Sequence, residues 1–214
     1  MNEKIKEVLT KEGITEFRPS QQKALDNGLL EGKSLLICTP TASGKTLIAE
    51  MAAMQTILEK GAKAVYIVPL IALANEKAKE FKRKYGHICK VALCTGDLDS
   101  ADPYLSDYDF IICTSEKLDS LIRHHSPWLA FVKCLIIDDI HLLNDVSRGP
   151  TLEILITILM KLLKDVQLVG LSATIGNPQE LAKWLKSELI IDNWRPVPLH
   201  KGTFFGGELE FIKE

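Results

Sequence analysis

The sequence predicts an α/β fold in which helices cover both faces of a mostly parallel, doubly wound β-sheet. Short apolar runs alternate with longer segments of helical periodicity, which is typical of right-handed β–α–β units. One apolar run is followed by a Gly-Lys-Thr motif, and a later one ends in two aspartates. With 214 residues and 46% hydrophobic composition, the chain is long enough for one domain with a full core.

The individual elements are placed by their hydrophobic pattern and by the residues that end them. A first helix is expected over residues 3–12 and a second over 20–30, because Gly13 and Gly32 follow as helix terminators. Strands are predicted at the apolar runs 34–38, 63–68, 90–94, 109–113, 133–138, 166–171 and 189–191. Helices are predicted between them at residues 45–59, 71–84, 115–124, 150–163 and 178–186. After Pro198 the pattern is lost, and we interpret the Gly-rich segment 201–214 as a domain end.

A phosphate-binding loop is predicted between the first strand and the next helix, where residues 39–46 are TPTASGKT. Small residues let successive backbone N–H groups surround phosphate oxygens at a helix N-terminus. Lys45 is expected to reach the β- and γ-phosphates, and the Thr46 hydroxyl to ligate Mg²⁺. The remaining contacts are expected from Thr41, Ala42, Ser43 and Gly44. An ordinary helix start is the alternative, since Gly-Lys-Thr alone is common and Thr39 stands where Gly or Ala is usual.

Two aspartates at the end of a later apolar run are the expected partners of this loop. In doubly wound sheets ligands gather at the carboxyl ends of the strands, so a carboxylate there would lie beside the phosphate loop. We expect Asp138 to anchor Mg²⁺ and Asp139 to orient or deprotonate the attacking water. A polar turn after a strand is the simpler alternative, but the combination with the phosphate loop favours a nucleotide site. A further strand is followed by Ser172-Ala173-Thr174, which completes the order of motifs.

The composition agrees with an enzyme domain that has no membrane contact. A net charge of −2 gives no general electrostatic attraction to nucleic acid, so any binding must be local. Residues 1–13 lack a signal-peptide core, and no apolar segment approaches membrane-spanning length, so a cytoplasmic location is expected. None of the five cysteines forms a Cys-x-x-Cys pair, which favours buried reduced thiols over disulfides or zinc.

The ordered motifs resemble the first RecA-like domain of a superfamily 2 helicase of the superkiller-like branch, and within it the archaeal Hjm-type fork DNA helicases. Residues 14–24 resemble the Q motif, 69–77 motif Ia, 95–97 and 114–123 further strand-contacting motifs, and 148–153 and 194–199 branch-specific segments. The similarity covers nearly all of the chain. It implies a RecA-like P-loop NTPase domain over residues 1–200, with 201–214 as a tail or the start of a linker to a second RecA-like domain.

The resemblance implies a role for each motif residue. ATP and Mg²⁺ are the implied cofactors, with Gln21 at the adenine edge and Phe17 beside the base. Contacts to the nucleic-acid backbone are implied for Pro69, Leu70, Thr95, Gly96, Thr114, Ser115 and Lys117. Coupling of the nucleotide state to the bound strand is implied for His141, Arg148, Ser172 and Thr174. Simpler roles stay open for two of them: Ser115 is a suitable N-cap for the following helix, and Lys117 could be a solvated surface charge.

Two residues depart from the family pattern. Asp139 stands where the family carries Glu, and a side chain shorter by one methylene reaches about 1.5 Å less. A displacement of roughly 1 Å at a reacting centre can cost on the order of 100-fold in rate, so either the backbone compensates or hydrolysis is slow. Ile71 stands where the family often carries a basic residue, which leaves one phosphate contact of the family open.

Other residues with metal-binding or stacking chemistry are assigned to the scaffold. His124 and His125 have no further ligands nearby in the sequence, so they are expected at a solvated helix end rather than in a metal site. Trp128, Trp184 and Trp194 are expected to pack in the fold rather than to stack on bases.

The function implied by the resemblance is the amino-terminal motor domain of an ATP-dependent DNA helicase that acts on forked or branched DNA in replication-fork repair and recombination. The expected partners are single-stranded and forked DNA, with RNA as an option, and a second RecA-like domain that supplies an arginine finger. Without the finger, phosphoryl transfer can lose a factor of roughly 10³ to 10⁵, so this domain, expected as a monomer, should be weak or inactive alone. The alternatives are an RNA helicase domain, a nucleotide-gated interaction module with little hydrolysis, and a metabolite kinase, which would need an acceptor pocket and lid arginines.

Overall fold

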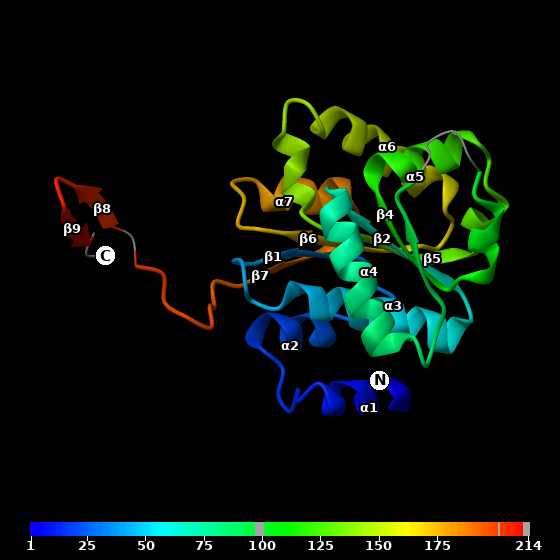
Figure 1. The fold of residues 1–214 in the computed structure, drawn as a ribbon, viewed down its shortest axis with the longest axis horizontal. Coiled ribbons are helices and arrows are strands. Elements are labelled where there is room, and N and C mark those ends of the chain that lie inside the picture. The colour runs from blue at the N-terminus through cyan, green and yellow to red at the C-terminus, as the bar shows by residue number, and fades with distance from the viewer. Residues whose placement is uncertain (97–100, 201, 212–214) are drawn as a thin grey trace.

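The computed structural model describes residues 1–96, 101–200 and 202–211, and within them the chain forms a seven-stranded sheet (Figure 1). The strands lie in the order β3-β4-β2-β5-β6-β1-β7, and every neighbouring pair is parallel. Their bounds are β1 Leu35–Cys38, β2 Lys63–Val68, β3 Val91–Cys94, β4 Phe110–Thr114, β5 Val132–Ile137, β6 Gln167–Ser172 and β7 Glu188–Ile191. The predicted α/β fold with a parallel sheet is therefore confirmed.

Helices cover both faces of this sheet (Figure 1). One face carries α1 Glu3–Lys11, α2 Pro19–Asp26, α3 Lys45–Lys60 and α4 Ile71–Tyr85. The other carries α5 Ser115–Arg123, α6 Gly149–Leu162 and α7 Pro178–Trp184, with the 3₁₀ turns η1 Pro103–Asp107, η2 Pro127–Phe131 and η3 Ile140–Asn144. This two-sided cover is why the sheet strands are nearly continuous apolar runs rather than alternating ones.

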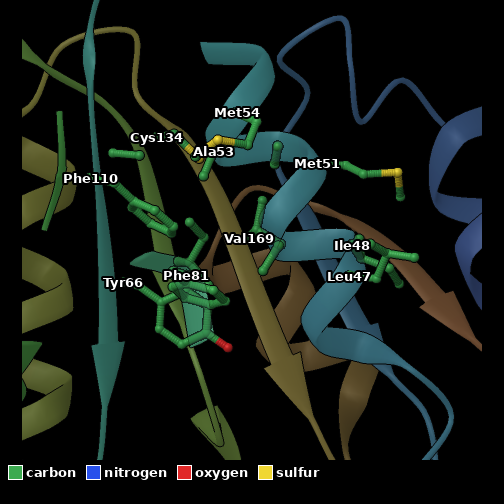
Figure 2. Packing of buried hydrophobic residues seen from close by; sticks show 14 of the residues in the cluster. Leu47, Ile48, Met51, Ala53, Met54, Tyr66, Phe81, Phe110, Cys134 and Val169 are labelled. Atoms are coloured by element: carbon green, nitrogen blue, oxygen red, sulfur yellow. The ribbon is translucent and has the colours of Figure 1, made fainter. Parts of the chain in front are cut away.

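Each face of the sheet has its own hydrophobic core, and the core under α3 and α4 positions the phosphate loop. In Figure 2, α3 side chains such as Ile48 and Met54 face aromatic and aliphatic side chains from the strands, among them Val169. Phe81 of α4 stacks on Phe110 of β4, with ring centroids 5.0 Å apart. Because α3 is fixed by this packing, the loop that leads into its N-terminus is fixed as well.

The elements differ from the sequence predictions mainly at their ends. The second helix ends at Asp26 rather than at residue 30, because the chain turns there and Gly28 adopts a positive φ of 86°. The three 3₁₀ turns were not predicted, since segments of five residues are too short to show a helical period.

The segment after Pro198 is not patternless, so that part of the interpretation was wrong. Gly202–Phe205 (β8) and Glu208–Phe211 (β9) pair as an antiparallel hairpin, and Gly206 and Gly207 between them have φ values of 61° and 87°. Two glycines with positive φ form the two-residue turn that suits the twist of a hairpin, and the Gly-Gly pair was its signal in the sequence. Residues 201 and 212–214 of the tail lie outside the described residues.

Three expectations drawn from composition can be compared with the fold. All five cysteines are buried and free, which confirms the expectation of buried thiols. His124 caps the exposed end of α5, as expected, and His125 follows it on the surface. Within the described ranges, no helix combines the length and the apolar character needed to cross a membrane.

Candidate active site and nucleic-acid interface

The phosphate loop, the two aspartates, the Ser172 motif and the strand-contacting segments follow strands at the carboxyl edge of the sheet, where they form two adjoining groups. The phosphate loop follows β1, the two aspartates follow β5 and the Ser172 motif ends β6, and these strands are neighbours in the order β5-β6-β1. The segments predicted to contact nucleic acid follow β2, β3 and β4, which are neighbours in the order β3-β4-β2. The nucleotide group and the strand-contacting group therefore meet where β2 pairs with β5.

The phosphate loop is held by contacts among its own residues. Thr39 Oγ1 lies 2.7 Å from Ser43 Oγ, and Thr39 N donates to the carbonyl of Ser172 at 3.2 Å. Ala42 and Gly44 adopt positive φ values of 65° and 94°, and a Cβ on Gly44 would collide with a neighbouring amide side chain. The Thr39 hydroxyl therefore has a structural role at a position where Gly or Ala is usual.

Lys45 is the first residue of α3, and its ammonium group folds back onto the loop. Its Nζ donates to the carbonyl oxygens of Thr39 at 2.8 Å and Pro40 at 3.0 Å. Burial lowers the pKa of Lys45, while the carboxylates of Asp138 and Asp139 act in the opposite direction. Charged phosphate oxygens are stronger acceptors than carbonyls, so this ammonium can exchange its present partners for a phosphate.

Asp138 follows β5 directly and is held on both carboxylate oxygens. The Tyr66 hydroxyl donates to its Oδ2 at 2.7 Å, and the backbone N–H of Asp139 donates to its Oδ1 at 3.0 Å. Burial raises the pKa of Asp138, although the hydrogen bond from Tyr66 opposes this shift. The result is a carboxylate of fixed orientation close to the phosphate loop, which is suited to hold a cation.

Asp139 lies in the left-handed region, with φ 50° and ψ 42°, and its side chain is 40% exposed. Its Oδ1 is 4.0 Å from Nδ1 of His141, and that nitrogen accepts a long hydrogen bond from the Ala173 N–H at 3.4 Å. His141 therefore contacts the loop at the end of β6 and lies close to the second acid. Two other residues predicted to couple the nucleotide to the strand, Ser172 and Thr174, flank Ala173, and the coupling roles of all three remain predictions.

A cleft of about 420 Å³ opens beside the phosphate loop, and Gln21 forms part of its wall. The Gln21 amide is engaged at both ends: its oxygen accepts from Arg18 N at 2.9 Å, and Nε2 donates to Gly44 O at 3.0 Å. One N–H and one lone pair of the amide remain for a base. Phe17 is half-buried and packs against the core under α3 and α4, and its place beside the base remains a prediction.

Replacing Gln21 with alanine is expected to remove a preference for ATP over GTP and to weaken ATP binding about tenfold. The amide can pair with the adenine edge but is mismatched by guanine, and its loss also frees the Gly44 carbonyl. Competition binding of the two nucleotides tests this. Gln22→Ala is the control, because Gln22 is an exposed neighbour whose amide donates to Asp26 at the surface. Equal affinities for ATP and GTP in the parent chain would contradict the assignment.

Arg18 is a site residue that sequence reasoning missed. Its Nη1 donates to the carbonyl of Ala42 at 2.7 Å, and its guanidinium lies 5.5 Å from the ring centroid of Trp194. Trp128 is buried and Trp184 packs against the second core, as expected. Trp194 is 37% exposed, and the contact described for its ring is the one with the Arg18 guanidinium. The position of Arg18, three residues before Gln21 in the Q motif, was the available signal.

A chain of charged side chains on α4 was also missed. Lys77 Nζ lies 3.3 Å from Thr46 Oγ1 and 3.5 Å from Glu80, and Glu80 in turn pairs with Lys84 at 2.6 Å. Lys84 also pairs with the buried Glu50 of α3 at 3.0 Å. Burial raises the pKa of Glu50, and Lys84 opposes the shift. The network places one ammonium group against the hydroxyl that was predicted to ligate metal.

The strand-contacting segments present mostly small and backbone groups. Pro69 and Leu70 follow β2, and Thr95 and Gly96 follow β3. Leu70 and the neighbouring Ile71 are both exposed. Thr114 caps α5 by accepting from the Lys117 N–H, so the cap is one residue earlier than the expected Ser115. Asp97, the last residue of one predicted motif, lies outside the described residues.

Arg148 stands apart from the other coupling residues. It precedes α6, is exposed, and borders a small hollow together with Pro69, Ser115 and Asp138. This hollow lies where the nucleotide group and the strand-contacting group adjoin. Arg148 therefore lies between the two groups. A coupling role for Arg148 remains a prediction.

Lys117 does not lie where a nucleic-acid contact requires it. Its side chain is 1% exposed, and its ammonium pairs with Asp102 at 2.7 Å in the core of the second face. Both expectations for it, a strand contact and a solvated charge, are therefore wrong. Lys117 precedes the buried Leu121 by four positions, so it shares the inward face of α5, and this spacing was the signal in the sequence.

Replacing Lys117 with methionine is expected to lower the free energy of unfolding by on the order of 3 kcal/mol, because it removes one partner of a buried ion pair. Denaturant unfolding measures this loss. Arg123→Met is the matched control, since it breaks the exposed pair with Asp119 on the same helix and should have a far smaller effect. If Lys117→Met kept the parental stability but bound single-stranded DNA more weakly, the result would support the predicted nucleic-acid contact of Lys117.

A comparison with models of known protein families shows to which family the chain belongs. The model of the DEAD/DEAH box helicase family matches residues 18–181, which include residues 18–24 of the Q motif, the phosphate loop, the two aspartates and the loop after β6. The chain belongs to this family. The RecA-like fold that the resemblance implied is thereby confirmed, with the nucleotide motifs in their expected order.

The chain is similar to curated relatives described as ATP-dependent DNA helicase Hel308. It is 56% identical over 207 residues to that of Pyrococcus abyssi, which covers 97% of this chain and 28% of the relative. It is 52% identical over 217 residues to that of Methanocaldococcus jannaschii, covering 98% of this chain and 18% of the relative. The chain thus spans well under a third of the length of these relatives, and the predicted resemblance to the archaeal superkiller-like DNA helicases is confirmed.

Solved structures give the same picture. A crystal structure of the DUF1998 helicase MrfA bound to DNA and AMPPNP matches with a TM-score of 0.77 and 30% identity, over 90% of this chain and 29% of that one. Another structure of MrfA matches with a TM-score of 0.74 and 27% identity over the same share of this chain.

Proposed function

We propose that this chain is the ATP-binding amino-terminal motor domain of an ATP-dependent DNA helicase that acts on forked or branched DNA. The observation that carries the proposal is the division of the carboxyl sheet edge into a phosphate-binding half and a strand-contacting half that adjoin at β2 and β5. The relatives that are half identical to the chain are described as ATP-dependent DNA helicases, which supports the same activity for the longer protein.

Mg²⁺ is the proposed metal, held by Thr46 and Asp138 together with the nucleotide phosphates. Asp138 offers a buried, oriented carboxylate, and the Thr46 hydroxyl stands in the first turn of α3 beside the phosphate loop. The Lys77 ammonium, 3.3 Å from Thr46 Oγ1, has to give up this hydrogen bond when the metal binds. Among the described residues, no cluster of three or more His, Cys, Asp or Glu could hold a metal by itself. Mg²⁺ suits such a site, because it is usually bound by one or two carboxylates plus substrate phosphates.

Different residues of the chain would then have different roles in ATP hydrolysis. The N–H groups of the phosphate loop and the Lys45 ammonium bind and orient the phosphates, while bound Mg²⁺ supplies charge neutralisation. Asp139 orients the attacking water or accepts its proton. The Asp139 side chain is partly exposed, so a water molecule can reach it from solvent. The remaining charge stabilisation falls to the arginine finger of a second RecA-like domain, so this domain alone is a weak hydrolase.

Single-stranded and forked DNA are the proposed partners of the strand-contacting half. Hydroxyls and backbone N–H groups at Thr95, Gly96 and Ser115 suit phosphate oxygens, and such contacts carry no sequence preference. Thr114 is buried and caps α5, so it supports this segment from below. MrfA, which is similar in structure, is described in complex with DNA and AMPPNP, which supports DNA rather than RNA. A role in fork repair and recombination follows from the same proposal.

Stimulation of ATP hydrolysis by nucleic acid tests this function. Steady-state hydrolysis by the longer protein should rise with single-stranded DNA and much less with RNA of the same sequence. Stimulation by RNA alone would favour an RNA helicase. Hydrolysis that neither strand stimulates would favour a nucleotide-gated interaction module, for which the shortened acid Asp139 is the specific observation.

A further inference from the structure

Tyr66 is a buried tyrosine at the nucleotide site that none of the motifs contains. It lies on β2, is fully buried, and its ring packs edge-on against Phe81 at 5.3 Å and Phe110 at 6.4 Å between ring centroids. Figure 2 shows the ring within this aromatic group, with its hydroxyl oxygen at the end facing away from Phe110. The ring is thus fixed by the core, and the position of its hydroxyl is fixed with it.

The hydroxyl is directed to one of the two proposed metal ligands. A buried tyrosine hydroxyl needs a hydrogen-bond partner, and this one donates to Asp138 Oδ2 at 2.7 Å. Since the Asp139 N–H donates to the other oxygen, rotation of the carboxylate about its Cβ–Cγ bond is opposed from both sides. The lone pairs that remain on the two oxygens are left for a cation and its water ligands.

We propose that Tyr66 is a positioning residue for metal binding, in that its hydroxyl sets the plane of the Asp138 carboxylate for Mg²⁺. The inference rests on the proposed function, because it takes Asp138 as the Mg²⁺ ligand. Side chains that hydrogen-bond a ligating group orient it, and their replacement typically costs 10- to 100-fold in metal affinity or activity. The Tyr66 hydroxyl also hydrogen-bonds with the hydroxyl of Thr46, the other proposed metal ligand. Its effect on metal binding therefore passes through these two ligands.

The fold contains a matched comparison for this role. Tyr85 of α4 is also buried, belongs to the same aromatic group through Phe81, and donates its hydroxyl to the carboxylate of Glu50 at 2.5 Å. Glu50 pairs with Lys84 and is not a proposed metal ligand. Tyr66→Phe and Tyr85→Phe therefore remove the same atom from the same kind of hydrogen bond in the same core, at different distances from the metal site.

The test is the Mg²⁺ dependence of binding of a fluorescent ATP analogue to the chain. In Tyr66→Phe, the Mg²⁺ concentration that gives half-maximal binding should rise about 10-fold or more, while binding in EDTA stays at the parental level. Tyr85→Phe should leave both quantities unchanged, although both variants lose thermal stability. In an Asp138→Asn background, Tyr66→Phe should change the Mg²⁺ requirement much less than it does in the parent chain, because only its contact with Thr46 is then left to lose.

Three results would overturn the role of Tyr66. They are a parental Mg²⁺ requirement in Tyr66→Phe, an equal change in Tyr85→Phe, and a loss of binding by Tyr66→Phe in EDTA, which would mean that the hydroxyl supports the whole site. Failure of the proposed function is distinguishable from these, because then the parent chain itself would bind the analogue without regard to Mg²⁺ or not at all.

Discussion

Replacing Lys45 with alanine is expected to abolish ATP binding at concentrations that saturate the parent chain, while the fold stays intact. The ammonium group lies in the centre of the phosphate loop, where it now satisfies the carbonyls of Thr39 and Pro40. A hydrogen bond to a charged group contributes about 1.5–3 kcal/mol, which corresponds to roughly 10- to 150-fold in affinity for one such bond. Lys45 is expected to make more than one, so the loss should be at the upper end of this range or beyond.

Equilibrium binding of a fluorescent ATP analogue measures this effect, and circular dichroism checks the fold. Lys60→Ala is the matched control, since Lys60 is an exposed lysine at the opposite end of the same helix. Parental affinity in Lys45→Ala would show that the loop is not the nucleotide site.

The two aspartates are expected to have separable roles. Asp138→Asn should weaken Mg²⁺-dependent nucleotide binding, because it removes the charge of the proposed metal ligand. Asp139→Asn should leave binding at the parental level and abolish hydrolysis in the longer protein, by on the order of 10²- to 10⁴-fold. The separation follows because a metal ligand stabilises the ground-state complex, whereas a group that orients water acts mainly in the transition state.

The substitution that addresses the shortened acid is Asp139→Glu. Asp139 has a positive φ of 50°, a conformation that Asp and Asn adopt more readily than most other side chains. This observation favours a backbone adapted to Asp, so the longer Glu should crowd the site and lower turnover with saturating single-stranded DNA. A rise in turnover would mean that the backbone has not adapted to Asp, and that the parent chain is slow because the Asp139 carboxylate does not reach the attacking water. Parental hydrolysis in Asp139→Asn would remove Asp139 from the catalytic residues.

The fold and the nucleotide motifs could be predicted because they depend on local signals. A parallel strand buried on both faces is a continuous apolar run, and its carboxyl end faces the ligand side whatever the rest of the sheet does. For that reason Lys45 and Asp138 could be placed at one edge without knowledge of the strand order. In the sheet, β1 and β5, the strands that precede these two residues, are separated by β6 alone.

The contacts that the sequence could not predict join side chains from elements far apart in the chain. Tyr66 reaches Asp138 across 72 positions, and Arg18 reaches Ala42 across 24. Such pairs depend on which strands are neighbours and on which way each ring or guanidinium points, and neither is encoded in the spacing of a motif. Lys117 is a different case, since its helical spacing from Leu121 did indicate burial, but its charge favoured the surface.

ATP-dependent unwinding of a forked DNA duplex tests the central claim most directly. The longer protein that contains this chain should separate the fork when ATP and Mg²⁺ are present, and its Lys45→Ala variant should not. Residues 1–214 alone should bind ATP without unwinding the fork. The claim would be contradicted by a longer protein that binds ATP yet neither hydrolyses it faster with DNA nor opens the fork, or by processive unwinding by residues 1–214 alone.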